Sequence, residues 1–225
     1  MKKTTETAAR VGRASQRSKG KGQKPKPRRG PGTRTAGSDT FAQTKLLHVP
    51  VTDYGKYVAQ ALRAGAHEAK VIPARNVITA EWVRLKCQFG CSGFGKRLCC
   101  PPRTPTPEEM REVLAAYRHA LIYSYVCTPD EYMPKRLRMQ RVVPAIERAA
   151  FLDGNYKSFG LMAGPCRLCK SCNLAGRCRH PELARPSMES CGIDVYATAR
   201  RSGIKLEVVT REDAVSKFIN LILIG

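Results

Sequence analysis

The sequence predicts an α/β or α+β domain, with a single mixed sheet of about four to five strands flanked by helices and carrying cysteine-rich metal-binding loops. Two observations lead to this prediction. Short aliphatic runs alternate along the chain with segments whose apolar residues recur at helical spacing. The chain has 225 residues, which is enough for one domain with a real core, so a second domain is not required.

The folded part should begin near residue 46 with a helix and two strands. Asp53 is a typical helix N-cap, and the apolar residues after it favour a helix to about Ala64. Residues 69–72 and 77–85 have the composition of strands. The second of these strands would deliver Cys87 to a metal site.

A capping box predicts the next helix. Thr106 is followed by proline at the first helical position and by Glu109 at the third. A strand should follow over residues 120–126, and then a helix over about 135–152. Pro144 lies inside that second helix and should kink it.

The C-terminal part should return to the sheet. A short strand over residues 158–162 leads into a cysteine-rich loop. Ser187 can cap a helix that Gly203 ends. A strand over 206–209, a short helix near Asp213 and a final apolar run complete the chain.

Residues 1–45 form a separate compositional zone, which we expect to be a disordered basic tail preceding a metal-binding domain at 46–225. The tail holds 13 of the 40 Lys and Arg residues of the chain, no hydrophobic period and a single aromatic residue. Such a charge attracts polyanions. Because charge runs alone are weak indications, we favour a solvated tail over a dedicated nucleic-acid arm, and nucleic acid stays open as a partner.

The ten cysteines are clustered. The N-terminus lacks the apolar run of a signal peptide, and no segment is long and apolar enough to span a membrane. We therefore expect a cytoplasmic protein with no membrane partner. In a reducing compartment, clustered thiols are better explained by metal than by disulfides.

One cysteine group is a loop, with Cys166, Cys169 and Cys172 at a strict spacing of three and Cys178 close behind. Three equally spaced thiols match three corners of a cubane iron–sulfur cluster. Zinc sites normally take two ligands from each of two separated chain segments. The spacing therefore favours a [4Fe-4S] cluster over zinc for this loop.

The other group comprises Cys87, Cys91 and the adjacent pair Cys99 and Cys100. The glycines at 90, 93 and 95 let the backbone adopt positive φ and turn N–H groups toward sulfur. Adjacent cysteines would need an awkward geometry to bind one centre together, so one of the pair should be a ligand, preferably Cys100. Zinc stays open as the metal of this group, because the spacing of its cysteines matches neither a typical zinc site nor a typical iron–sulfur site well.

Cysteine counting suggests two sites of four thiols each. Either Cys178 or Cys191 completes the loop site and the other completes the first group, an exchange that ferredoxins also use. A single cluster, with the other thiols structural, stays open, and we expect Cys127 to be an inert core residue and Cys99 to be spare. The predicted ligands are Cys87, Cys91, Cys100, Cys166, Cys169, Cys172, Cys178 and Cys191.

These motifs resemble those of a known family. The combination includes Cys87-x3-Cys91, Cys100-Pro101-Pro102, Cys166-x2-Cys169-x2-Cys172 and Cys191-Gly192-Ile193. It resembles an uncharacterised prokaryotic family of predicted metal-binding proteins over about residues 46–209. The resemblance implies metal or iron–sulfur binding, and it implies no particular reaction.

Taken together, these features predict an iron–sulfur protein with one or two [4Fe-4S] clusters. It would serve electron transfer or act as a redox accessory to a partner enzyme. A zinc-stabilised binding module with a nucleic-acid-attracting tail is one alternative, and an iron–sulfur enzyme with an open iron site is another. An enzyme is the less favoured interpretation, because no set of side chains in the sequence has the spacing of a catalytic site. The oligomeric state stays open.

Overall fold

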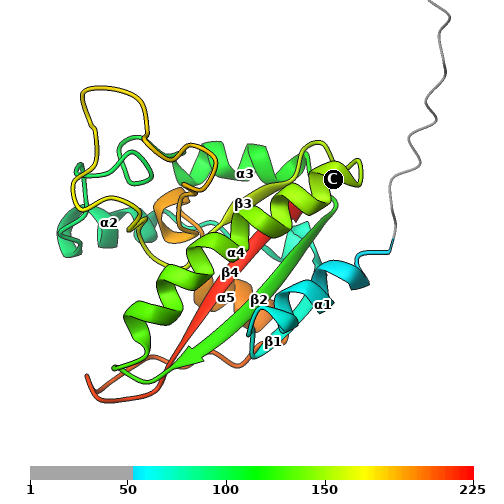
Figure 1. Ribbon diagram of the computed structural model, residues 1–225. Coiled ribbons are helices and arrows are strands. Elements are labelled where there is room, and N and C mark those ends of the chain that lie inside the picture. The colour runs from blue at the N-terminus through cyan, green and yellow to red at the C-terminus, as the bar shows by residue number, and fades with distance from the viewer. Residues whose placement is uncertain (1–52) are drawn as a thin grey trace, which may run out of the picture. The chain divides into compact units, whose positions relative to one another are not determined.

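The computed structural model describes residues 53–225, and the basic tail predicted for residues 1–45 lies outside this part. Figure 1 shows the arrangement of its elements. The helices are α1 (Gly55–Arg63), α2 (Glu81–Gly90), α3 (Pro107–Ala115), α4 (Tyr132–Leu152) and α5 (Val195–Arg201). The strands are β1 (Glu68–Pro73), β2 (His119–Cys127), β3 (Phe159–Leu161) and β4 (Ser216–Ile224), and two 3-10 turns are η1 (Ala74–Asn76) and η2 (Glu189–Cys191).

The four strands form one sheet in the order β1-β2-β4-β3. Every neighbouring pair is antiparallel. The fold is therefore α+β, which confirms the predicted class, but the sheet is antiparallel rather than mixed. The two long strands β2 and β4 lie at its centre, so the C-terminal apolar run supplies a central strand.

Alternation along β2 divides the core into two layers. Ala120 and Ile122 pack with residues of α3 and α5 on one face, and Leu121 and Tyr123 pack with residues of α1 and α4 on the other. Successive side chains of a strand point to opposite faces, so both faces of this strand are apolar. Burying a side chain such as Leu121 or Ile122 stabilises the fold by roughly 1.5–3 kcal/mol.

The capping box at Thr106 is confirmed. The Glu109 amide donates to Thr106 Oγ1 across 3.1 Å, and the Thr106 amide donates to Glu109 Oε2 across 2.8 Å. Helix α3 begins at the next residue, Pro107. Pro144 lies on the buried side of α4, which continues unbroken from Tyr132 to Leu152.

The strand predicted for residues 77–85 is wrong, because a helix begins there at Glu81. Within it, Val83 is buried, whereas Trp82, Leu85 and Phe89 are exposed. The spacing of these three exposed residues is helical, and only one β-branched residue, Val83, lies within the helix. Cys87 is consequently held on a helix.

The segment after the cysteine loop also differs from the prediction. Ser187 Oγ accepts a hydrogen bond from the Ser190 amide at the short turn η2, and α5 starts later, with Asp194 as its N-cap. Gly192, at φ 75°, separates the two helical segments. A continuous helix could not pass through this left-handed residue.

Two further predicted elements are absent from the described part of the chain. Residues 206–209 form no strand, and no helix forms near Asp213. Val208 and Val209 are exposed, so they make no core contact that would hold a strand in the sheet. Within residues 53–225, no helix is both long and apolar enough to cross a membrane.

Candidate metal centre

The cysteines of both groups lie at the ends of elements rather than within the sheet. Helix α2, the segment that follows it, the cysteine loop and η2 gather beside one end of the sheet (Figure 1). The Leu98 amide donates to Cys172 Sγ across 3.4 Å, which brings the segment after α2 against the loop. Residues far apart in sequence thus form one cysteine-rich region.

Three thiols of the first group line one pocket of about 400 Å³. They are Cys87 near the end of α2, Cys91 directly after the helix, and Cys100 in the following segment. Burial, together with the nearby Cys91, raises the pKa of the Cys100 thiol to about 11. Burial and the neighbouring Cys91 also raise the pKa of Cys87. The predicted trio therefore converges on one space.

Backbone groups around this trio match the expectation for the glycines only in part. The Gly93 amide donates to Cys91 Sγ across 3.4 Å. Of the glycines at 90, 93 and 95, Gly95 alone has a positive φ, at 70°, and its amide donates to the Pro101 carbonyl across 2.8 Å. That bond closes the segment into a loop and fixes the approach to Cys100.

Cys191 lies apart from the pocket lining. It is buried in the core layer beside α3 and α5, together with residues such as Ile193. Burial raises its pKa to about 12, with a further contribution from nearby Cys87. Cys191 is thus a neighbour of the first group, and its assignment as a fourth ligand stays a prediction.

The loop thiols Cys166, Cys169, Cys172 and Cys178 are all half-buried. Besides the bond from Leu98 to Cys172, the His180 amide donates to Cys178 Sγ across 3.4 Å. Amide N–H groups directed at sulfur stabilise the anionic form of a thiolate site.

Cys99, expected to be spare, lies against this loop. A hydrogen bond from Cys99 lowers the pKa of Cys166, and the same contact, together with burial, raises the pKa of Cys99. The nearby Cys178 raises the pKa of Cys99 further. Cys99 therefore belongs to the loop group in space, whereas the adjacent Cys100 belongs to the pocket.

The cysteine loop is anchored to α4 by two buried polar residues that the sequence analysis did not single out. Arg136 Nη2 donates to the Pro165 carbonyl across 2.7 Å. Gln140 Nε2 donates to the same carbonyl across 3.3 Å, and its Oε1 accepts from the Arg167 amide across 3.1 Å. Their spacing of four places both on one helix face, which was the available signal. They fix the backbone on both sides of Cys166.

A second anchor holds the chain after Cys178. Arg185 forms two bonds of 2.6 Å with the Glu147 carboxylate of α4, and both side chains are largely buried. Glu147 Oε2 also accepts from the Gly160 amide across 2.7 Å. The structure thus places Arg185 in an ion pair with α4.

A third set of contacts ties α2 to η2. Arg84 donates to the carbonyls of Thr104 and Pro105, and Thr104 Oγ1 donates to the Ser190 carbonyl. The Cys87 thiol donates to the Glu189 carbonyl across 3.8 Å. The walls of the pocket are therefore connected to each other by hydrogen bonds.

The residues fit a thiolate-bound metal group in their chemistry. Within residues 53–225, no three His, Cys, Asp or Glu side chains form a group that could hold a single metal ion as they stand. The donor set consists of thiols, and at Cys91, Cys172 and Cys178 the sulfur accepts a backbone amide hydrogen bond. Soft thiolate ligands of this kind select zinc or iron–sulfur clusters.

Fold and site together define a cysteine-rich metal-binding α+β protein. The chain belongs to the family described as predicted metal-binding protein (DUF2284), which matches residues 70–224 and confirms the resemblance found in the motifs. Searches of curated proteins and of solved structures gave no match.

Proposed function

We propose that this metal-binding protein is an iron–sulfur protein that transfers electrons to a partner protein. The observation that carries the proposal is the arrangement of nine of the ten cysteines. They lie in two groups that meet where Leu98 bonds to Cys172 and where Cys99 contacts Cys166.

The spacing and the hydrogen bonds favour iron–sulfur over zinc. The loop presents three thiols at equal spacing, which suits the corners of a cubane, and zinc sites are typically built from separated pairs. Cys91, Cys172 and Cys178 each accept a backbone amide hydrogen bond. Such bonds stabilise the negative charge of a cluster and tune its reduction potential.

The two groups would hold one [4Fe-4S] cluster each. Cys166, Cys169 and Cys172 would bind the loop cluster, with Cys178 or Cys99 as the fourth ligand. Cys87, Cys91 and Cys100 would bind the other. When bound, such clusters supply one-electron chemistry. The anchors on α4 would hold the thiols of the loop in place. The cation Arg97 opposes the rise in the pKa of nearby Cys100, and it would offset the negative charge of a cluster there.

The redox partner would dock on the exposed face of α2. Trp82, Leu85 and Phe89 are 48%, 56% and 78% exposed, and they share the helix that carries Cys87. Exposed Lys86 lies on the same helix as these three residues, whose apolar surface we call the α2 face. An electron-transfer protein with an acidic rim and an apolar centre complements it in charge and in polarity.

The proposal is tested with protein reconstituted without oxygen. Cys87→Ser and Cys166→Ser should each remove part of the iron and sulfide, and each should remove a different part of the electron paramagnetic resonance spectrum of the reduced protein. Cys127→Ser is the matched control, because this thiol is buried at the end of β2. Stoichiometric zinc without sulfide in the wild-type protein would refute the iron–sulfur assignment and favour the zinc-stabilised binding module.

A further inference from the structure

We propose that the pocket at Cys87, Cys91 and Cys100 binds a small anionic molecule with an apolar, ring-sized body, which occupies an open position on the metal centre there. The inference rests on the proposed function, because it requires a cluster at these thiols. It goes beyond electron transfer by assigning a ligand site. The metal centre of the first cysteine group would then have an open position for a ligand, whereas the metal centre of the loop would not.

The number of thiols that reach the pocket is the first step. Cys87, Cys91 and Cys100 line it, and Cys191 is not among its lining residues. Cys191 is instead 1% exposed and packed in the core layer of α3 and α5. A cubane has four corners, so a cluster held by these three thiols would have one iron without a protein ligand.

The pocket is also shaped for more than a metal group. Its volume of about 400 Å³, which the metal group and the ligand would share, lies in the lower part of the range of small-molecule sites, about 300–1,000 Å³. Most of its wall is apolar or aromatic. The residues that would contact an apolar ring are Trp82, Val83, Phe94, Pro101, Ile193 and Tyr196.

Two polar side chains at the pocket define the ligand further. Lys86 is exposed, lines the pocket and forms no ion pair with any residue in the described part of the chain, so it is available to an anion. Glu189 also lines the pocket, but its Oε2 atom is buried, so a ligand there meets the cation of Lys86 and no exposed carboxylate oxygen of Glu189.

The chemistry of the pocket therefore selects one class of molecule. An anionic donor atom, a carboxylate or a thiolate, would meet the open corner and Lys86. An apolar ring would lie against Trp82 and Phe94.

The test uses the reduced holoprotein without oxygen and follows its electron paramagnetic resonance spectrum. Cyanide probes an open iron position, and phenylacetate probes the whole pocket. Both should shift the spectrum in a saturable manner. Trp82→Ala should weaken phenylacetate binding about tenfold and leave the cyanide response unchanged, because the lost aromatic contact serves only the ring. Phe89→Ala on the same helix, outside the pocket lining, is the matched control.

The outcomes separate this inference from the proposed function. Wild-type protein that contains iron and sulfide but gives no spectral change with either probe would overturn the inference alone. A cyanide response that appears only in Cys191→Ser would also overturn it, because Cys191 would then be the fourth ligand. Protein without iron or sulfide would instead contradict the proposed function.

Discussion

The Leu98 amide donates a hydrogen bond to the Cys172 thiol across 3.4 Å, although 74 residues separate them in the chain. This contact places the next residue, Cys99, against the loop group and leaves Cys100 to the pocket. Two adjacent cysteines therefore serve different groups. The two cysteines lie in a turn, in which the Cys100 amide donates to the Arg97 carbonyl across 3.2 Å.

Cys99→Ser is expected to reduce the iron and sulfide content of the loop site, because Cys99 contacts Cys166 and lies near Cys178. The measurement is iron and sulfide per chain after anaerobic reconstitution, with Cys127→Ser as the control. Unchanged iron in Cys99→Ser would show that this thiol is spare, as the sequence alone suggested.

Gln140→Leu should destabilise the cysteine loop. The change removes the bonds to the Pro165 carbonyl and from the Arg167 amide, and it leaves that amide without its side-chain acceptor. An unsatisfied buried group costs about 1–3 kcal/mol. We expect a loss of this size in the free energy of unfolding, measured with urea, and faster release of iron to a chelator. Arg141→Leu, at the exposed neighbouring position of α4, should change neither quantity.

Gly192→Ala should destabilise the whole domain. Gly192 has a φ of 75°, and a Cβ atom there would lie 2.7 Å from Pro107 Cα and 2.5 Å from Pro107 Cγ. The strained backbone conformation alone costs of order 1–3 kcal/mol, and the clash with α3 adds to it. Thermal unfolding of Gly90→Ala provides the control, since a Cβ atom at Gly90 would meet nothing within 4 Å. Equal melting temperatures for the two variants would contradict the structure at η2.

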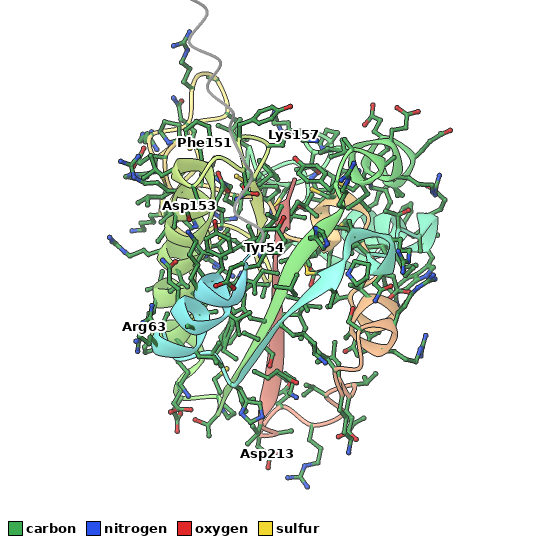
Figure 2. The ribbon with its side chains drawn as sticks, turned by 90° about the vertical axis from the view of Figure 1, so that its right-hand side faces the viewer. Tyr54, Arg63, Phe151, Asp153, Lys157 and Asp213 are labelled. Carbon is green, nitrogen blue, oxygen red and sulfur yellow. The ribbon has the colours of Figure 1, made fainter. Side chains whose placement is uncertain are left out.

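The contact between α1 and α4 should give the protein an acid-sensitive component of stability. Asp153 lies at the end of α4 near the start of α1 (Figure 2). Hydrogen bonds from Lys56 Nζ, at 2.5 Å, and from the Tyr57 hydroxyl, at 2.7 Å, lower the pKa of Asp153 below its ordinary 3.8. A carboxylate with a lowered folded-state pKa stabilises the fold above the unfolded-state pKa, and this contribution is lost as the pH falls through the folded-state pKa.

The difference in unfolding free energy between the wild type and Asp153→Asn should therefore be largest near neutral pH and shrink from about pH 5 to about pH 2. Urea unfolding at a series of pH values measures it. Asp213→Asn is the control, because this exposed residue pairs only with Arg211 two positions away. A difference that grows as the pH falls would contradict the assigned contacts.

Phe89→Ser should slow electron transfer to an acidic partner without changing the iron content. Phe89 is the most exposed of the three residues of the α2 face, at 78%, so the substitution removes apolar contact area and leaves the core intact. Stopped-flow oxidation of the reduced protein by a purified acidic flavodoxin measures the rate, which we expect to fall about tenfold. Phe151→Ser, at an exposed position near the end of α4, is the control. Equal rates for the two variants would remove the α2 face from consideration as the docking site.

The parts of the fold that local chemistry determines could be predicted from the sequence. The capping box at Thr106 and the apolar runs that form β1 and β2 depend on neighbouring residues, and they were placed correctly. The start of α2 was missed because Thr79 and its neighbours have strand composition, and the exposed stripe at Trp82 was taken for strand residues. Local composition does not distinguish an exposed apolar stripe from a buried one.

The convergence of the first cysteine group could be predicted from the sequence, but the place of Cys99 could not. Cys87, Cys91 and Cys100 do converge on one pocket, as expected. That Cys99 joins the loop depends on the contact between Leu98 and Cys172, and such long-range contacts leave no trace in spacing. The anchors Arg136 and Gln140 were missed for the same reason, since their partners lie more than 20 residues away.

The presence of two iron–sulfur clusters is tested by measuring iron, acid-labile sulfide and zinc per chain in protein purified without oxygen, together with its visible absorption. We expect about eight iron and eight sulfide per chain, as two [4Fe-4S] clusters require, and a brown colour that bleaches on reduction. Zinc in stoichiometric amount, with neither sulfide nor colour, would contradict this expectation.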